Sequence, residues 1–275
     1  MINPRSALAL KALLQPEVVV RLLLRRFSVG SFEFRLALDA VDRPWYAYGI
    51  YEAAQLARRL GVSSIRILEF GVAGGDGLVA MEQSVREVEK ISGVQIQIFG
   101  FDTGIGMPVH TDYRDLPYIW RSGHYKMNLE AVRARLKRAT VVLGDVSETV
   151  PRFLKETVGY GPIGFVGFDL DYYSSTAAAL RIFEGPDSSY LPRVFCYFDD
   201  VIGSDEQLHC EDVGELLAIR DFNANQIPQH RIRPINGLAS KRLFRSAWAP
   251  CMRIYHRFDH PQYSDYIGAG PLPSN

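Results

Sequence analysis

Short apolar runs alternate with longer helical segments along the chain from residue 64 onward. The runs are rich in β-branched and aromatic residues, which is typical of strands, and the segments between them have helical periodicity. Seven strands are predicted, at residues 65–70, 94–101, 140–143, 163–168, 194–198, 231–235 and 252–258. Helices are predicted at residues 78–90, 128–138, 147–155, 176–184 and 211–223, with Ser147 as the N-cap of the third. Repeated strand-then-helix units specify a parallel sheet with helices on both faces.

The last two predicted strands lack a long helix between them, so we expect an antiparallel hairpin at one edge of the sheet. The predicted fold class is therefore α/β, with a doubly wound, mostly parallel seven-stranded sheet of the Rossmann-like kind. Around this sheet the chain divides into three predicted parts. These are a helical N-terminal extension or lid at 1–60, the sheet domain at 61–260 and a surface tail at 261–275.

Composition and charge narrow the expected partners. Of the 275 residues, 47% are hydrophobic, which suffices for one large α/β core. Lys+Arg and Asp+Glu number 31 each, so no global field favours nucleic acid or an anionic membrane, and neither partner is expected. The three cysteines are far apart, which suits a reducing cytoplasm. The apolar-rich segment 7–24 predicts an amphipathic helix packed on the domain or on a second copy, so a homodimer is a reasonable expectation.

Acidic residues stand at the carboxyl ends of five consecutive predicted strands. In open α/β sheets, ligands bind beyond these ends. The residues are Glu69, Asp102, Asp145, Asp169 with Asp171, and Asp199 with Asp200. A single acid at a strand end is commonly a helix cap. Five such ends in succession would gather carboxylates around one crevice, where their repulsion must be offset by hydrogen bonds, cations or a cationic ligand. The pattern indicates a functional site.

The first predicted strand runs into a glycine-rich turn at residues 69–77 (EFGVAGGDG). The spacing differs from GxGxxG, which disfavours a dehydrogenase, and it matches the acidic-x-Gly-x-x-x-Gly pattern of class I methyltransferases. A ligand lying across this turn requires backbone without Cβ, at Gly71 and Gly75. The carboxylate of Glu69 suits the ammonium group of S-adenosylmethionine. We therefore predict S-adenosylmethionine as the cofactor.

Two further strand ends suit the nucleoside part of this cofactor. Asp102, with Thr103 beside it, occupies the place where an acidic residue hydrogen-bonds ribose hydroxyls. Dehydrogenases use the same device, so this feature alone does not separate the two classes of enzyme. Asp145 and Val146 follow the third strand, where methyltransferases contact the adenine.

Three segments resemble motifs of the macrocin O-methyltransferase family. They are FDTGIGMP at 101–108, FDLDYYSST at 168–176 and FDD at 198–200, and with the glycine turn the resemblance covers about residues 68–203. Members of that family methylate hydroxyls on sugars of antibiotics and on related small molecules. The resemblance implies a small-molecule acceptor and a divalent metal, Mg²⁺. It also implies Asp169, Asp199 and Asp200 as metal ligands and Asp171 as the general base.

The chemistry of these residues agrees with the implied roles, because a hard dication takes carboxylate oxygens as ligands. Two alternatives stay open: a metal-independent methyltransferase acting on nitrogen or carbon, and a non-catalytic protein that binds the nucleoside. The loop at 103–126 is long and aromatic, and such loops are commonly functional. It is expected to serve as a lid over the acceptor or to pack into the core.

Overall fold

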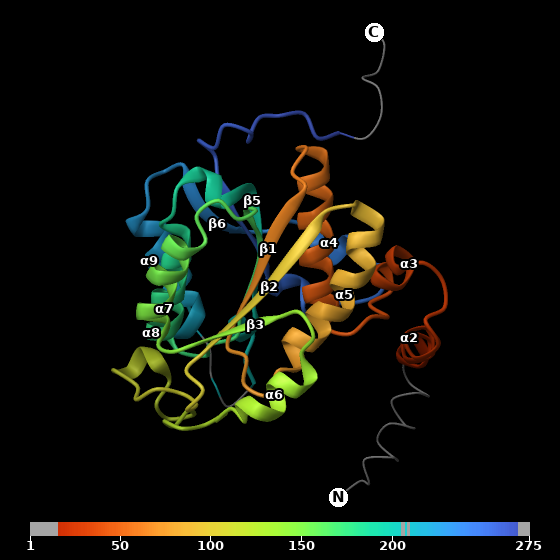
Figure 1. Ribbon diagram of the computed structural model, residues 1–275. Helices are drawn as coiled ribbons and strands as arrows, with labels where there is room; N and C mark the ends of the chain where they lie inside the picture. The colour runs from red at the N-terminus through yellow and green to blue at the C-terminus, as the bar shows by residue number, and fades with distance from the viewer. Residues whose placement is uncertain (1–15, 205–206, 208–209, 269–275) are drawn as a thin grey trace, which may run out of the picture.

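A seven-stranded sheet forms the centre of the computed structural model, which describes residues 16–204, 207 and 210–268 (Figure 1). The strands lie in the order β3-β2-β1-β4-β5-β7-β6. They are β1 (Ser64–Phe70), β2 (Gln95–Asp102), β3 (Thr140–Leu143), β4 (Ile163–Phe168), β5 (Tyr190–Phe198), β6 (His230–Pro234) and β7 (Met252–Arg257). Strands β1 to β5 are parallel, and β7 pairs antiparallel with both β5 and β6. The predicted fold class and the antiparallel pairing at the edge are confirmed.

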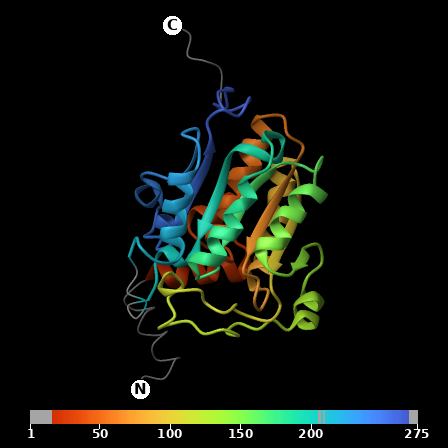
Figure 2. The same cartoon turned by 90° about the vertical axis from the view of Figure 1, so that its left-hand side faces the viewer.

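Helices cover both faces of the sheet. The helices α4 (Pro44–Arg59) and α5 (Asp76–Ser92) lie on one face, and α7 (Val146–Glu156), α8 (Tyr173–Ala179) and α9 (Gly214–Asn225) lie on the other (Figures 1 and 2). The remaining α-helices of the described chain are α2 (Pro16–Phe27), α3 (Phe32–Ala37), α6 (Leu129–Arg135) and α10 (Leu238–Lys241). Within the described residues, no helix is both long and apolar enough to cross a membrane. Residues 1–15 of the predicted extension and 269–275 of the predicted tail lie outside the described residues.

Several helix bounds differ from the prediction: the helix predicted at 176–184 is α8 at Tyr173–Ala179, and the one predicted at 211–223 is α9 at Gly214–Asn225. Two other differences have local reasons. Ser147 is not the N-cap of α7, because Asp145 caps this helix and its Oδ1 accepts a hydrogen bond from the Ser147 amide at 2.8 Å. The helix predicted at 128–138 ends at Arg135, because Oε1 of Glu82 accepts hydrogen bonds from the amides of residues 137–139. These amides are thereby drawn out of the helical ladder.

Four phenylalanines stack across the sheet just before the strands end. Phe70 pairs in register with Phe101 on β2 and with Phe168 on β4, and Phe168 pairs with Phe198 on β5. Their ring centroids are 4.6, 5.4 and 4.5 Å apart, respectively. Successive residues of a strand point to opposite faces of the sheet. The stacked rings hold the four strands in register, so the residues that follow the rings lie at the same edge of the sheet. Three of the four are followed directly by aspartate, so the stack aligns Asp102, Asp169 and Asp199 at one edge.

Candidate functional site

A cavity of about 660 Å³ lies at the carboxyl ends of the central strands. It is bounded by the turn after β1, the ends of β2, β4 and β5, the start of α7 and the loop after β2. The predicted site residues that line it are Glu69, Gly71, Asp102, Thr103, Asp145, Val146, Asp169, Asp171, Asp199 and Asp200. Gly75 is not among the lining residues and instead occupies the N-cap position of α5 with a φ of 82°. The strand-end acids therefore face a single cavity.

The glycine turn depends on two positions that admit no side chain. Gly71 has a φ of 89°, and a Cβ built there would lie 1.8 Å from the carbonyl oxygen of Asp169. A Cβ on Gly77 would lie 1.6 Å from Oε1 of Glu69. The turn thus brings the β1 and β4 strand ends into backbone contact and leaves its own backbone bare toward the cavity.

Glu69 is a buried acid that can still accept a hydrogen bond from a ligand. Its side chain is 1% exposed, and within the described chain its Oε2 has no hydrogen-bond partner. Burial raises the pKa of Glu69 to about 8, and the negative charge of Asp169 acts in the same direction. A cationic group entering the cavity would find an acceptor here.

Asp102 braces the glycine turn from the neighbouring strand. Its Oδ2 accepts hydrogen bonds from the amides of Val72 at 3.0 Å and Ala73 at 2.9 Å, and its Oδ1 accepts one from the Gly104 amide at 2.7 Å. An ionised carboxylate has about four acceptor positions, so one remains for a ligand hydroxyl in this cavity. The ribose contact that the sequence suggests remains a prediction.

Asp145 and Val146 form the wall of the cavity at the first turn of α7. Asp145 is partly committed to capping this helix through its Oδ1. Its position beside β3, the outermost strand at this edge of the sheet, places it farthest along the row of strand ends from Asp199 on β5. The predicted adenine contact is therefore at one end of the cavity.

The carboxylates at the other end are crowded, with Asp200 buried and Asp169, Asp171 and Asp199 partly buried. Burial raises the pKa of Asp171 to about 7, and the charges of Asp169 and Asp199 add to this effect. The pKa values of Asp169 and Asp200 are raised well above the usual range, first by burial and then by neighbouring aspartates. Asp171 also has a left-handed backbone with a φ of 57°. Burial and the mutual repulsion of these carboxylates therefore both oppose their ionisation.

The three aspartates predicted to bind a metal do not form a coordination shell here. Across the part of the chain that the structure describes, no three His, Cys, Asp or Glu side chains are placed so that they could hold a metal ion. Protein donors orient two of the aspartates instead. Oδ1 of Asp199 accepts a hydrogen bond from the hydroxyl of Tyr197 at 2.8 Å, and Oδ2 of Asp200 accepts one from the Asp171 amide at 2.9 Å. The donor chemistry and excess negative charge fit a dication, whereas the arrangement of the ligands does not.

Glu215, at the start of α9, is a site-adjacent acid that sequence reasoning missed. It is fully buried, and its Oε2 accepts a hydrogen bond from the Asp200 amide at 3.0 Å. Burial, then the charge of Asp200, raises its pKa well above the usual range. Glu215 lies within the helix predicted at 211–223, where an acid is commonly solvent-exposed, so the sequence offers no signal for this contact.

The loop after β2 crosses the carboxyl end of the sheet and forms one wall of the cavity (Figure 2). Its lining residues are Thr103, Gly106, Met107, Pro108, Val109, Thr111, Trp120 and Tyr125. Tyr113 and Tyr118 are exposed and are not among the lining residues, and the Tyr118 hydroxyl donates to the carbonyl of Gln207 at 2.5 Å. Part of the loop therefore lines the cavity, and its role as a lid over an acceptor remains a prediction.

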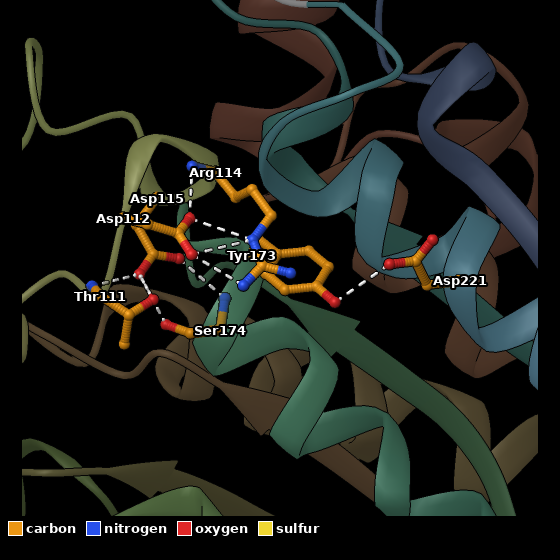
Figure 3. A network of polar contacts seen from close by, with 7 residues as sticks. All are labelled: Thr111, Asp112, Arg114, Asp115, Tyr173, Ser174 and Asp221. Carbon is orange, nitrogen blue, oxygen red and sulfur yellow. Dashed lines mark hydrogen bonds and ion pairs between the residues drawn. The ribbon is translucent and has the colours of Figure 1, made fainter.

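Asp115 anchors this loop to α8 (Figure 3). The side chain is fully buried, and its Oδ2 accepts hydrogen bonds from the amide and hydroxyl of Thr111 and from the hydroxyl of Ser174. Its Oδ1 accepts one from the Ser174 amide at 2.8 Å. Beside it, the guanidinium of Arg114 lies 4.4 Å from the ring centroid of Tyr173. Because Thr111 and Ser174 both line the cavity, the anchor sets the position of this wall.

Arg43 is a second residue that the sequence does not single out. It precedes Pro44 at the N-cap of α4 with a φ of 43°, and it lines the cavity. Burial works to lower its pKa, but the electrostatic effects of Tyr46 and of the carboxylates Glu69, Asp169 and Asp199 outweigh burial and raise it. Arg43 is the one cationic side chain among the described lining residues.

Comparison with known proteins supports the architecture. Neither a protein-family model nor a curated protein matches the sequence. Among solved structures, the chain is similar to CalS11, the calicheamicin methyltransferase, with 20% identity over 93% of this chain and 94% of that one, and a TM-score of 0.51. It is also similar to the O-methyltransferase NovP, with 15% identity over 78% and 80% of the two chains and a TM-score of 0.53. The chain therefore has the α/β, Rossmann-like fold of these methyltransferases.

Proposed function

We propose that this protein transfers a methyl group from S-adenosylmethionine to a hydroxyl of a small molecule such as a sugar or a natural product. The observation that carries the proposal is the one cavity that contains both a bare glycine turn and a crowded, partly buried aspartate cluster. The turn suits a nucleoside cofactor, and the cluster suits proton removal from an acceptor. The names of the two solved proteins of similar fold, a methyltransferase and an O-methyltransferase, agree with this function.

Each end of the cavity has a separate task in this mechanism. Asp145 and Val146 contact the adenine, Asp102 and Thr103 contact the ribose, and Glu69 faces the amino-acid end. Asp171 takes the proton of the acceptor hydroxyl as its oxygen attacks the methyl carbon. The carbon–sulfur bond breaks, its electron pair stays on sulfur, and the products are a methyl ether and S-adenosylhomocysteine. The sulfonium is already a good leaving group, so positioning contributes much of the remaining acceleration.

We also propose that Asp169, Asp199 and Asp200 bind a divalent cation, Mg²⁺. When bound, it would lower the pKa of the acceptor hydroxyl and orient the acceptor. Support comes from the crowded carboxylates, whose raised pKa values reflect burial and mutual repulsion. Some side-chain movement is required, because these carboxylates are not placed as one ligand set in the described structure.

Replacing Asp171 with asparagine tests the proposed reaction. The variant is expected to bind S-adenosylhomocysteine like the wild type and to transfer the methyl group at least about 100-fold more slowly, since general-base catalysis contributes this much. Calorimetry measures binding, and transfer of a labelled methyl to a panel of glycosides and phenols measures turnover. Asp212→Asn, at an exposed position that does not line the cavity, is the matched control. Wild-type protein that binds no S-adenosylhomocysteine would contradict the proposed function.

Chelation tests the metal. In EDTA, turnover is expected to fall at least about tenfold and to recover on addition of excess Mg²⁺, because a lost Lewis acid leaves the hydroxyl pKa unlowered. S-adenosylhomocysteine binding should change little, since the glycine turn and Asp102 lie at other strand ends. Full turnover in EDTA would instead favour metal-independent transfer. Binding without any turnover would favour a non-catalytic nucleoside-binding protein.

The remaining expectations from the sequence stay predictions. They are a cytoplasmic location, a homodimer formed through the N-terminal segment, and partners that include neither nucleic acid nor a membrane. In the described part of this segment, α2 carries exposed Val20, Leu22, Leu23 and Phe27.

A further inference from the structure

Charge is distributed unevenly around the cavity. Eight carboxyl groups line it, at Glu69, Asp76, Asp102, Asp145, Asp169, Asp171, Asp199 and Asp200. Against these stands Arg43, the one cation among the described lining residues. An anionic ligand group entering this cavity would be repelled almost everywhere, so its position would be set by this single guanidinium.

The guanidinium of Arg43 is influenced by the carboxylates around it without being engaged by them. Charges of Glu69, Asp169 and Asp199 act on its pKa, and its own charge helps to lower the pKa of Asp76. Its interactions within the described chain are long-range charge effects and contacts with the rings of Trp45 and Tyr46, at 6.0 and 5.5 Å from the centroids. Arginine has five donors arranged in a fork that fits a carboxylate. These donors remain free for a ligand.

The order of the strands indicates which ligand group reaches Arg43. Along the cavity, β3, β2, β1 and β4 lie side by side in that sequence. With the adenine at Asp145 after β3 and the ribose at Asp102 on β2, the rest of the cofactor extends past the glycine turn after β1. Arg43 lines the cavity together with Glu69 and Asp169, at the ends of β1 and β4. Its guanidinium lies over the ring of Tyr46, which packs against Phe165 of β4. The amino-acid end of the cofactor must therefore come to this place.

We infer that Arg43 binds the α-carboxylate of S-adenosylmethionine, an assignment that rests on the proposed function. The ammonium attached to the same carbon faces the free oxygen of Glu69. A cation at the start of α4 and an acid at the end of β1 are thus matched to the two opposite charges of one zwitterion. Arg43 therefore distinguishes the intact cofactor from nucleosides that lack an amino-acid end.

Two ligands that differ only in that end test this inference. S-adenosylhomocysteine carries the amino-acid group, and 5′-methylthioadenosine replaces it with a methyl. Arg43→Met is expected to raise the Kd of S-adenosylhomocysteine about 10- to 100-fold, the range for a lost hydrogen bond to a charged group. The Kd of methylthioadenosine should change less than about twofold, because it has no carboxylate to lose. Arg43→Lys, which retains the charge, should give a smaller loss for S-adenosylhomocysteine than Arg43→Met does.

Arg59→Met is the matched control, because it removes an exposed arginine from the other end of the same helix. It should leave both affinities unchanged. If Arg43→Met weakens the two ligands equally, the guanidinium acts on the shape of the cavity and the inference is wrong. It is also wrong if neither affinity changes. Wild-type protein that binds neither ligand overturns the proposed function and the inference together, an outcome distinct from the other two.

Discussion

Replacing Glu69 with glutamine is expected to flatten the pH dependence of stability of the ligand-free protein. In the folded state the pKa of Glu69 is raised to about 8 by burial, compared with its usual value of 4.5. Between these values the folded protein retains a proton that the unfolded chain has lost, so stability falls as the pH rises. Linkage puts the loss at roughly 3 kcal/mol between pH 5 and pH 8 from this one group. Glutamine does not titrate, so the variant lacks this loss of stability. Urea unfolding of the wild type and the variant at several pH values measures the difference in the free energy of unfolding.

Glu82→Gln provides a control of opposite sign. This side chain is also buried, but its carboxylate accepts hydrogen bonds from three backbone amides, which outweigh burial and lower its pKa. Its contribution to stability is present above its usual pKa and is lost as the pH falls through the lowered one. The variant should therefore be less stable than the wild type at neutral pH. Parallel stability profiles for the wild type and Glu69→Gln would contradict the assignment of Glu69 as a buried, protonated acid.

Replacing Gly71 with alanine is expected to destabilise the protein by about 2–5 kcal/mol and to abolish cofactor binding. The backbone φ of 89° is strained for an alanine, at a cost of about 1–2 kcal/mol. The new Cβ would also lie 1.8 Å from the Asp169 carbonyl oxygen, so the ends of β1 and β4 must separate, which adds about 1–3 kcal/mol. Thermal or urea unfolding measures the first effect, and calorimetry with S-adenosylhomocysteine measures the second.

Gly93→Ala is the control that separates the cost of backbone strain from the cost of the steric clash at Gly71. Gly93 also has a positive φ, of 71°, at the end of α5, but no atom lies within 4 Å of its built Cβ. It should lose only about 1 kcal/mol and retain full binding. Equal losses for the two variants would mean that the contact between the β1 and β4 ends does not hold the turn in place.

Much of the sheet and the location of the site follow from patterns within a few residues. A strand in this chain is an apolar run, and three of the central ones end in Phe-Asp. The stacked phenylalanines align these strand ends, so acids that are far apart in sequence are adjacent in space. Local hydrogen bonds shift the helix boundaries by a few residues. In α7, for example, the N-cap is Asp145 and not Ser147.

Residues that reach the site from distant segments could not be predicted in this way. Arg43 precedes the first strand by some twenty residues and comes to the cavity because α4 packs across the sheet. Glu215 reaches Asp200 from α9 through a backbone amide. The ligand geometry of the aspartates was also beyond the sequence, because it depends on hydrogen bonds such as the one from Tyr197 to Asp199.

In the loop after β2, the residues that fix the path of the backbone, centred on the buried Asp115, differ from the residues that face the cavity. The path of the loop is fixed by four hydrogen bonds to this carboxylate, whereas the residues that would touch an acceptor, such as Val109 and Tyr125, are exposed and bear little of the folding energy. Selectivity could then drift through these side chains while the framework beneath them stays the same. A scaffold built in this way can acquire new acceptors one substitution at a time without losing its fold.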